Sequence, residues 1–121
     1  PPRAALLEGQ ELRIKNLANA CPTRVASGQA LLVEGAGGFY SPIAHDGLNA
    51  DLAQVLGLPI ILVAEDRVGC LNHILLVAEA IKRRSLTLAG VILNTKTSPV
   101  AGMDNASDLM TWLKIPVLFL S

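Results

Sequence analysis

The chain has 121 residues, with 10 Lys+Arg against 10 Asp+Glu and a formal net charge of zero. This balance gives no electrostatic reason to expect a nucleic acid or an anionic membrane as a partner. Hydrophobic residues make up 51% and aromatic residues only 3%, so the composition is that of a globular, aliphatic-rich chain. The mean hydropathy of +0.46 is high for a free-standing unit of this size, and predicts that a further segment or a partner covers part of the core.

Targeting and redox signals are weak. The longest apolar stretch, residues 59–64, is far shorter than the ~20 residues of a membrane-spanning helix. The first residues lack the basic flank and apolar segment of a signal peptide. Cys21 and Cys70 are too few for a disulfide framework or a zinc pattern. We therefore expect a cytoplasmic protein with no membrane partner.

In chain order, aliphatic runs alternate with segments of helical spacing. The runs do not alternate with polar residues, which is typical of strands buried on both faces; they are 30–33, 59–64, 88–93 and 116–120. The clearest helix is 71–84, which ends in Lys82, Arg83 and Arg84, where the helix dipole favours cations.

Three shorter helices are also predicted. One covers residues 11–20. A second covers 50–56, with Asn49 as its cap and Gly57 as its end. The third opens near Asn105, has Asp108 in its first turn, and buries Leu109, Trp112 and Leu113.

This alternation predicts an α/β fold: a three-layer parallel sheet with flanking helices, joined by right-handed crossovers. No repeat or linker divides the chain, so we expect a single domain over residues 1–121. In such sheets ligands bind at the carboxyl ends of the strands. The residues that follow each aliphatic run are therefore the candidate site.

Glu34 directly follows the first run, and Gly35, Gly37 and Gly38 come next. Backbone without Cβ atoms lets a charged ligand approach closely. A carboxylate at this point could hold Mg²⁺ together with phosphate oxygens and water. The alternative is that Glu34 is merely solvated and the glycines only form a turn, because short glycine motifs are common.

The second run leads through Gly69 into the long helix at Cys70, Leu71 and Asn72. A glycine that opens a helix leaves the first amides available to a phosphate or carboxylate, and Asn72 could add a donor. Alternatively, Gly69 is a turn residue, Asn72 is satisfied locally, and Cys70 is a small buried residue. We expect His73 to be packed or solvated, since it has no identifiable partner.

Asn94 ends the third run and offers a donor and an acceptor, as the edge of a purine requires, although Asn is also a common turn residue. Residues 96–102 are expected to form a loop. Its Lys96 either meets a phosphate or is solvated.

Four of these segments, in this order and spacing, resemble dethiobiotin synthetases. They are LVEGAGG at 32–38, DLA at 51–53 with LGLP at 56–59, GCLNH at 69–73 and AGVILN at 89–94; residues 2–9 also resemble that family. The resemblance implies a P-loop NTPase-like fold and a cytoplasmic, homodimeric ligase of biotin biosynthesis. Such an enzyme uses ATP and Mg²⁺ to carboxylate 7,8-diaminononanoate with CO₂ and close the ring of dethiobiotin.

The resemblance also implies roles for individual residues. Glu34 would bind the metal, and the backbone of Gly37 and Gly38 would line the place where the carbamate meets the γ-phosphoryl group. Asn94 would bind the adenine. The substrate carboxylate would be received across a dimer interface by the start of the long helix, at Gly69, Cys70, Leu71 and Asn72.

The chain departs from that family in its phosphate-binding loop. The sequence contains no G-x-x-x-x-G-K-[ST] segment, and neither the family's catalytic lysine nor its last nucleotide-contacting segment is found. We therefore expect the middle and C-terminal part of such a domain, without its P-loop strand. It would be inactive alone, and completed by a second copy or an N-terminal segment.

Two other functions stay open at this point. One is a non-catalytic α/β module for interaction or oligomerisation. The other is a related P-loop ligase or partitioning ATPase, which the register of Gly69 to His73 with Asn94 argues against.

Overall fold

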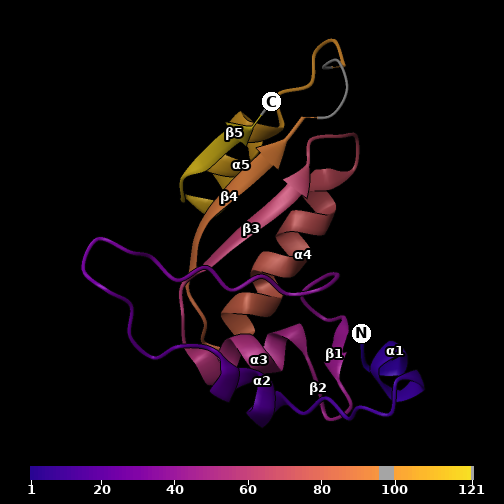
Figure 1. The fold of residues 1–121 in the computed structure, drawn as a ribbon. Helices are drawn as coiled ribbons and strands as arrows, with labels where there is room; N and C mark the ends of the chain where they lie inside the picture. Colours follow the sequence, from indigo (N-terminus) through magenta and orange to yellow (C-terminus); the bar gives the residue numbers. More distant parts are fainter. Residues whose placement is uncertain (96–99, 121) are drawn as a thin grey trace. The chain divides into compact units, whose positions relative to one another are not determined.

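The structure is a computed structural model that describes residues 1–95 and 100–120 (Figure 1). The chain divides into two compact units, residues 1–57 and 58–121. The first unit contains α1 (Pro2–Leu7), α2 (Ile14–Ala20), β1 (Pro42–Ala44), β2 (Gly47–Leu48) and α3 (Asn49–Leu56). The second contains β3 (Ile60–Glu65), α4 (Cys70–Arg83), β4 (Leu88–Asn94), α5 (Asn105–Leu113) and β5 (Val117–Leu120).

A small core holds the first unit together. Ile14 of α2, Ala44 of β1 and Leu52 of α3 are buried against one another, and β1 and β2 pair as an antiparallel hairpin. The turn of this hairpin also sets the start of α2. The Leu12 carbonyl accepts from the His45 amide at 2.9 Å, and the Ile14 amide donates to Asp46 Oδ1 at 2.9 Å. The helix therefore begins at Ile14, whereas the sequence spacing predicted a start at residue 11.

The predicted strand at residues 30–33 is wrong. This segment has no strand geometry, and Leu32 is 86% exposed. A strand needs a neighbour for its backbone hydrogen bonds, and the two sheets of the described residues are β1-β2 and β3-β4-β5. An aliphatic composition does not make a strand where the backbone lacks such a partner.

The predicted cap of α3 is also wrong, whereas its end is confirmed. Asn49 is the first residue of the helix, and the Leu48 amide instead donates to Asp51 Oδ2 at 2.7 Å. The Asp51 carboxylate thus accepts from the amide just before the helix, whereas Asn49 lies inside the helix and is not its cap. Gly57 ends the helix in the left-handed conformation, at φ 62.

The second unit is an α/β arrangement with a parallel sheet and flanking helices, which confirms the predicted fold class. Its strands run in the order β3-β4-β5, and both pairings are parallel. Figure 1 shows the three strands side by side, with α4 running along the sheet. The predicted helix at 71–84 is confirmed as α4, with Lys82 and Arg83 in its last turn.

One face of this sheet carries the core of the unit. Val91 and Leu93 alternate along β4, and both are packed against α4 and α5. Cys70 and Ile74 come from α4, and Ala106 and Leu109 come from α5; partly buried residues complete the cluster, among them Leu62, Ala64 and Val117. The residues between them in the strands point to the opposite face, where Ile61, Val63, Leu118 and Leu120 are more than half exposed.

One residue of α5 was assigned to the wrong face. Leu109 is fully buried and Leu113 packs against the core, as predicted, whereas Trp112 is 72% exposed. Asn105, Ala106, Leu109 and Leu113 form the buried side of the helix, and position 112 lies at the edge of that side, on the flank away from Ala106.

Two residues of α4 allow a direct test of the core. Ile74 is 1% exposed, whereas Leu76, two positions further on, is 57% exposed. We expect Ile74→Ala to lower the free energy of unfolding by about 2–5 kcal/mol, because it leaves a cavity. The control Leu76→Ala should change it by less than about 0.5 kcal/mol. Urea denaturation measures both, and equal effects would contradict the assigned face of α4.

Asp104 caps the start of α5. Its Oδ2 accepts from Ser107 Oγ at 2.7 Å, and its Oδ1 accepts from the Ser107 amide at 3.1 Å. The hydrogen bond from the Ser107 hydroxyl has the larger effect and the one from the Ser107 amide the smaller. Together they hold the pKa of Asp104 below its ordinary value of 3.8.

This lowered pKa predicts a pH dependence of stability. The contribution of the charged cap is fully present above the unfolded-state pKa of 3.8 and is lost as the pH falls through the lower folded-state pKa. Asp104→Asn keeps a capping oxygen but does not titrate. Between about pH 5 and about pH 2, urea denaturation should therefore show a larger loss of stability for the wild-type chain than for D104N. Parallel curves would contradict this expectation.

Candidate functional site

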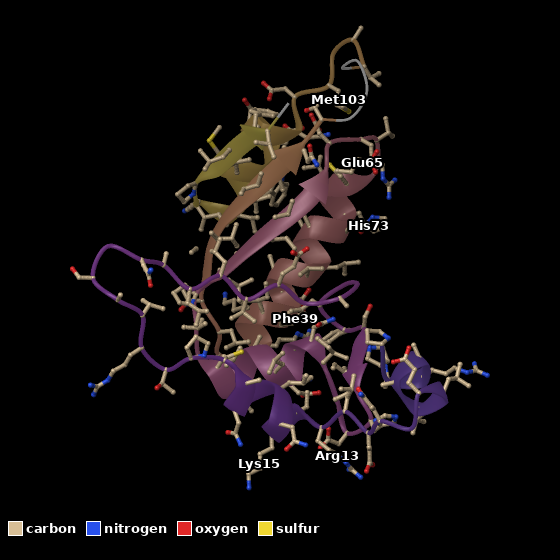
Figure 2. The ribbon with its side chains drawn as sticks, in the orientation of Figure 1. Arg13, Lys15, Phe39, Glu65, His73 and Met103 are labelled. Atoms are coloured by element: carbon tan, nitrogen blue, oxygen red, sulfur yellow. The ribbon has the colours of Figure 1, made fainter. Side chains whose placement is uncertain are left out.

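The carboxyl ends of β3 and β4 lie next to each other in the second unit. Glu65 is level with Asn94 in the parallel register, and the Asp66 amide donates to the Asn94 carbonyl at 3.0 Å. Figure 2 labels Glu65, the last residue of β3, and His73, in the first turn of α4. Asn94 and the start of α4, both predicted from the sequence as site elements, therefore share one end of this sheet.

The start of α4 has the backbone geometry of an anion site. Gly69 precedes the helix at φ 85, and no side chain caps it. The Cys70 amide donates to the Arg67 carbonyl at 3.1 Å. The next amides, those of Leu71 and Asn72, belong to the first turn and lack intrahelical acceptors.

The four predicted substrate-binding residues differ in what they can offer. Cys70 is 3% exposed and belongs to the core, and Leu71 packs against that core. Cys70 therefore offers a ligand only its backbone, and it is the small buried residue that the alternative interpretation expected. Asn72 has an exposed side chain and could add a donor. His73 is exposed as well, which is the solvated one of the two environments expected for it.

The side chain of Asn105, for which the sequence predicts no role, supports the loop before α4. This side chain is 6% exposed, and its Nδ2 donates to Asp66 Oδ1 at 2.7 Å and to the Arg67 carbonyl at 3.5 Å. An Asn at a predicted helix start indicates only a local cap. Nothing in the local sequence points to a partner 39 residues away.

In the first unit, Asn49 organises the glycine segment that follows Glu34. Its Nδ2 lies within hydrogen-bond distance of three backbone carbonyls, at 2.8 Å from Ala36, 2.9 Å from Gly38 and 3.2 Å from Ser41. The Gly38 amide donates to Ser41 Oγ at 2.9 Å. The glycine segment is thus folded around two side chains, Asn49, which was predicted only as a helix cap, and Ser41, which had no predicted role.

Two of the glycines are required by this packing. A Cβ at position 35 would lie 2.4 Å from Asn49 Oδ1, and one at position 37 would lie 2.8 Å from Ser41 Oγ. Gly37 also has φ 81, which residues with a side chain rarely adopt. A Cβ at position 38 would lie 3.7 Å from its nearest neighbour, Ser41 Oγ, which is an ordinary contact distance. The shape of the segment therefore accounts for Gly35 and Gly37 without a ligand.

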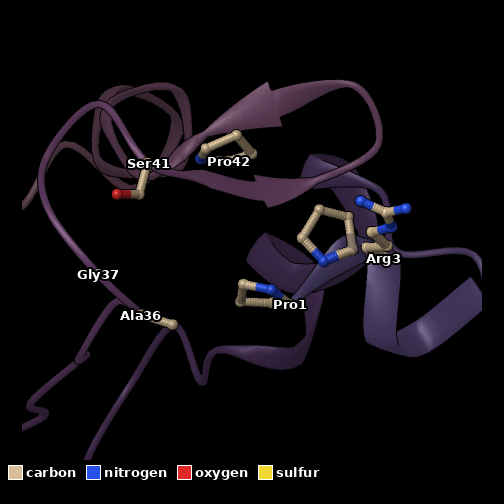
Figure 3. Close-up of a pocket in the computed structure, with 7 residues that line it drawn as sticks. Pro1, Arg3, Ala36, Gly37, Ser41 and Pro42 are labelled. Atoms are coloured by element: carbon tan, nitrogen blue, oxygen red, sulfur yellow. The ribbon is translucent and has the colours of Figure 1, made fainter.

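The same segment lines a pocket of about 390 Å³. Ala36, Gly37, Ser41 and Pro42 form one part of the lining, and Pro1, Pro2 and Arg3 form the other (Figure 3). Arg3 carries the one charged side chain of this lining, so the pocket offers a cation and bare backbone next to each other.

The predicted metal ligand, Glu34, is exposed at the start of the glycine segment. Among residues 1–95 and 100–120 no group of three or more His, Cys, Asp or Glu side chains could hold a metal ion. Mg²⁺ commonly takes only one or two protein carboxylates and completes its shell with phosphate oxygens and water. A lone exposed carboxylate fits that mode of binding.

Within the described residues, no helix is both long and apolar enough to cross a membrane.

Comparison with known proteins identifies the family. Residues 1–120 match the model of a family described as AAA domain. The chain belongs to the AAA domain family. This membership confirms the P-loop NTPase-like class predicted from the sequence.

Individual relatives of this AAA domain are more specific. The chain is 40% identical over 119 residues to the ATP-dependent dethiobiotin synthetase of Ralstonia nicotianae, covering 98% of this chain and 52% of the relative. It is 45% identical over 104 residues to that of Phenylobacterium zucineum, covering 84% and 44%. It is 42% identical over 99 residues to that of Anaeromyxobacter dehalogenans, covering 82% and 44%. The resemblance to dethiobiotin synthetases is thereby confirmed, and the chain spans about half the length of these curated relatives.

The roles of single residues in this AAA domain stay predictions. This applies to Glu34 as metal ligand, to the backbone of Gly37 and Gly38, to Asn94 at the adenine, and to the helix start at 69–72. Lys96 lies outside the described residues.

A pair of substitutions tests how the glycine segment is held. In Gly35→Ala, the new Cβ would collide with Asn49 Oδ1 and displace an amide that makes three hydrogen bonds. We expect a loss of about 1–3 kcal/mol in unfolding free energy, because hydrogen bonds to the segment are lost. Gly38→Ala is the control and should cost less, since its Cβ has space.

The double variant makes this test specific. With Asn49 replaced by Ala the obstacle is gone, so Gly35→Ala should cost little in that background, and the two single effects should not add. Urea denaturation of the four proteins closes the cycle. Additive effects would contradict the proposed contact between Asn49 and position 35.

Proposed function

We propose that this chain is part of an ATP-dependent dethiobiotin synthetase, and that residues 1–121 belong to one larger synthetase domain. The observation that carries the proposal is the match to the Ralstonia relative, which extends over 98% of this chain and so includes every predicted site segment. The relatives are named as ATP-dependent, which supports ATP as a substrate. A non-catalytic module is not favoured by these comparisons.

The proposed reaction follows the resemblance. One amine of 7,8-diaminononanoate takes up CO₂ as a carbamate, the carbamate oxygen attacks the γ-phosphorus of ATP, and ADP leaves. The second amine then attacks the carbamate carbon and releases phosphate, which closes the cyclic urea. Such phosphoryl transfer depends on positioning and charge neutralisation more than on covalent chemistry of the protein.

In the first unit, Glu34 and the glycine segment would bind the metal and the phosphoryl groups. Glu34 is an exposed carboxylate and would hold Mg²⁺, which when bound neutralises the charge of phosphate oxygens. The backbone of Gly37 and Gly38 would contact the transferred group. Because the Gly38 amide donates to Ser41 Oγ, that bond must open before this amide can reach a phosphoryl oxygen.

In the second unit, the start of α4 would bind the substrate carboxylate. The uncapped amides of the first turn and the positive end of the helix dipole favour an anion there. Asn94 would bind the adenine through its amide. A homodimer, a complementing segment with the phosphate-binding loop and a cytoplasmic location belong to the same proposal and rest on the resemblance.

Complementation tests this function. The chain is mixed with the part of the Ralstonia synthetase that lies outside the match, and dethiobiotin formation is measured beside MgATP binding by calorimetry. We expect turnover only in the mixture and weak ATP binding by the chain alone, because each missing preorganised donor costs about 100-fold or more. Absence of both binding and turnover in the mixture would favour the non-catalytic module.

Glu34→Gln in the active mixture tests the metal assignment. We expect turnover to fall by about 100-fold or more through loss of charge at the metal. The unfolding free energy should stay within about 0.5 kcal/mol of wild type, because the side chain is exposed. The matched control is Glu79→Gln, which removes an exposed carboxylate paired with Arg83 on α4 and should leave turnover unchanged. Full activity of E34Q would refute Glu34 as the metal ligand.

A further inference from the structure

Asn105 is a buried polar residue whose partners lie in another part of the sequence. It is the first residue of α5 and 6% exposed. Its Nδ2 donates to Asp66 Oδ1 at 2.7 Å, and the same nitrogen is 3.5 Å from the Arg67 carbonyl. Burial of an amide is unfavourable unless it is hydrogen-bonded, so this side chain and the segment after β3 hold each other in place.

The segment held by Asn105 joins two elements of the candidate site. Residues 66–69 run from the end of β3 to Gly69, where α4 begins. The amide of Asp66 donates to the Asn94 carbonyl, while its carboxylate accepts from Asn105. The Arg67 carbonyl accepts from the Cys70 amide in the first turn of α4. Both residues that Asn105 contacts are therefore bonded in turn to a site element.

Other contacts do not fix this segment equally well. Val68 and Gly69 are exposed, and the guanidinium of Arg67 reaches only the Val68 carbonyl, at 3.4 Å. Gly69 has φ 85 and no side chain that could restrain it. A loop that ends in a glycine and carries few buried contacts opens easily. The hydrogen bond between Asn105 and Asp66 is its anchor to the core side of the sheet.

We propose that Asn105 is a positioning residue for the anion site at the start of α4. It acts through Asp66 and Arg67 and does not touch the ligand. Where the first amides of α4 receive the substrate carboxylate, a role that rests on the proposed function, Asn105 sets the affinity for that carboxylate. Because the Asp66 amide is bonded to the end of β4, the same contact also steadies Asn94.

The test is Asn105→Ala in the complemented enzyme. We expect the KM for 7,8-diaminononanoate to rise about tenfold, with kcat changed by less than about twofold, since one charge-assisted hydrogen bond is lost outside the reacting groups. Leu113→Ala is the matched control: it also weakens the packing of α5 but lies two turns away from Asn105. An equal change of KM in L113A, or an unchanged KM in N105A, would overturn the proposal.

Asp66 provides the second pair of variants, which decides the matter if N105A does not fold. Asp66→Ala removes the acceptor from the partly exposed side of the contact and should reproduce the rise in KM. Asp66→Asn keeps an acceptor oxygen and should recover most of the affinity. A rise that is the same in D66N and D66A would overturn the role of the hydrogen bond.

Hydrogen exchange of the chain alone separates this inference from the proposed function. In N105A, the amides of Asp66 and Cys70, which donate to the Asn94 and Arg67 carbonyls, should exchange about tenfold faster than in wild type, and in L113A they should not show this local change. If the wild-type mixture makes no dethiobiotin, the proposed function fails while the exchange result still tests the anchor. If the mixture is active and exchange is unchanged in N105A, the anchor itself is refuted.

Discussion

The parallel hydrogen bonds between β3 and β4 are the constraint on which the second unit depends. They bring Glu65 level with Asn94 and continue in the bond from the Asp66 amide to the Asn94 carbonyl. The same register places Val91 and Leu93 toward α4 and α5, where the core forms. A shift by one residue would turn these two side chains to the other face and remove the core. The position of Asn94 beside the start of α4 is thus fixed by the same pairing that makes the unit stable.

Both candidate loops are held by the same device, an asparagine at the first position of a helix. Asn49 opens α3 and donates to carbonyls of the glycine segment, and Asn105 opens α5 and donates to the segment before α4. Capping uses an acceptor oxygen, and here aspartates supply it, Asp51 in α3 and Asp104 in α5. The asparagine amide groups can therefore donate to the backbone or side chains of the two loops. A short loop that contains glycine has few side chains of its own to hold it in place.

What the sequence predicted well is what local pattern determines. The apolar runs of β3, β4 and β5 and the spacing of α4 and α5 are each contained in a short window, and the aliphatic residues chosen for the core are there. The errors concern partners distant in sequence. Residues 30–33 have the composition of a strand but no neighbour to pair with, and Asn49 was assigned a local cap although its amide reaches Ala36, 13 residues away. Trp112 was assigned to the core from its apolar character, although it lies at the edge of the buried side of α5.

One face of the parallel sheet exposes aliphatic side chains, which accounts for part of the high mean hydropathy, and the same face carries residues of the candidate site. Ile61 and Val63 of β3 and Leu118 and Leu120 of β5 are more than half exposed on it, and parallel sheets of this class are normally covered on both faces. Side chains alternate along a strand, so Glu65 and Asn94 project to this same face at the strand ends, in register with Leu120. A layer that covered the aliphatic residues would therefore reach the edge of the sheet beside Asn94. Under the proposed function, in which Asn94 binds the adenine, one packing event would both cover the core and complete the nucleotide site. Binding and stability should then be gained together when the chain is complemented.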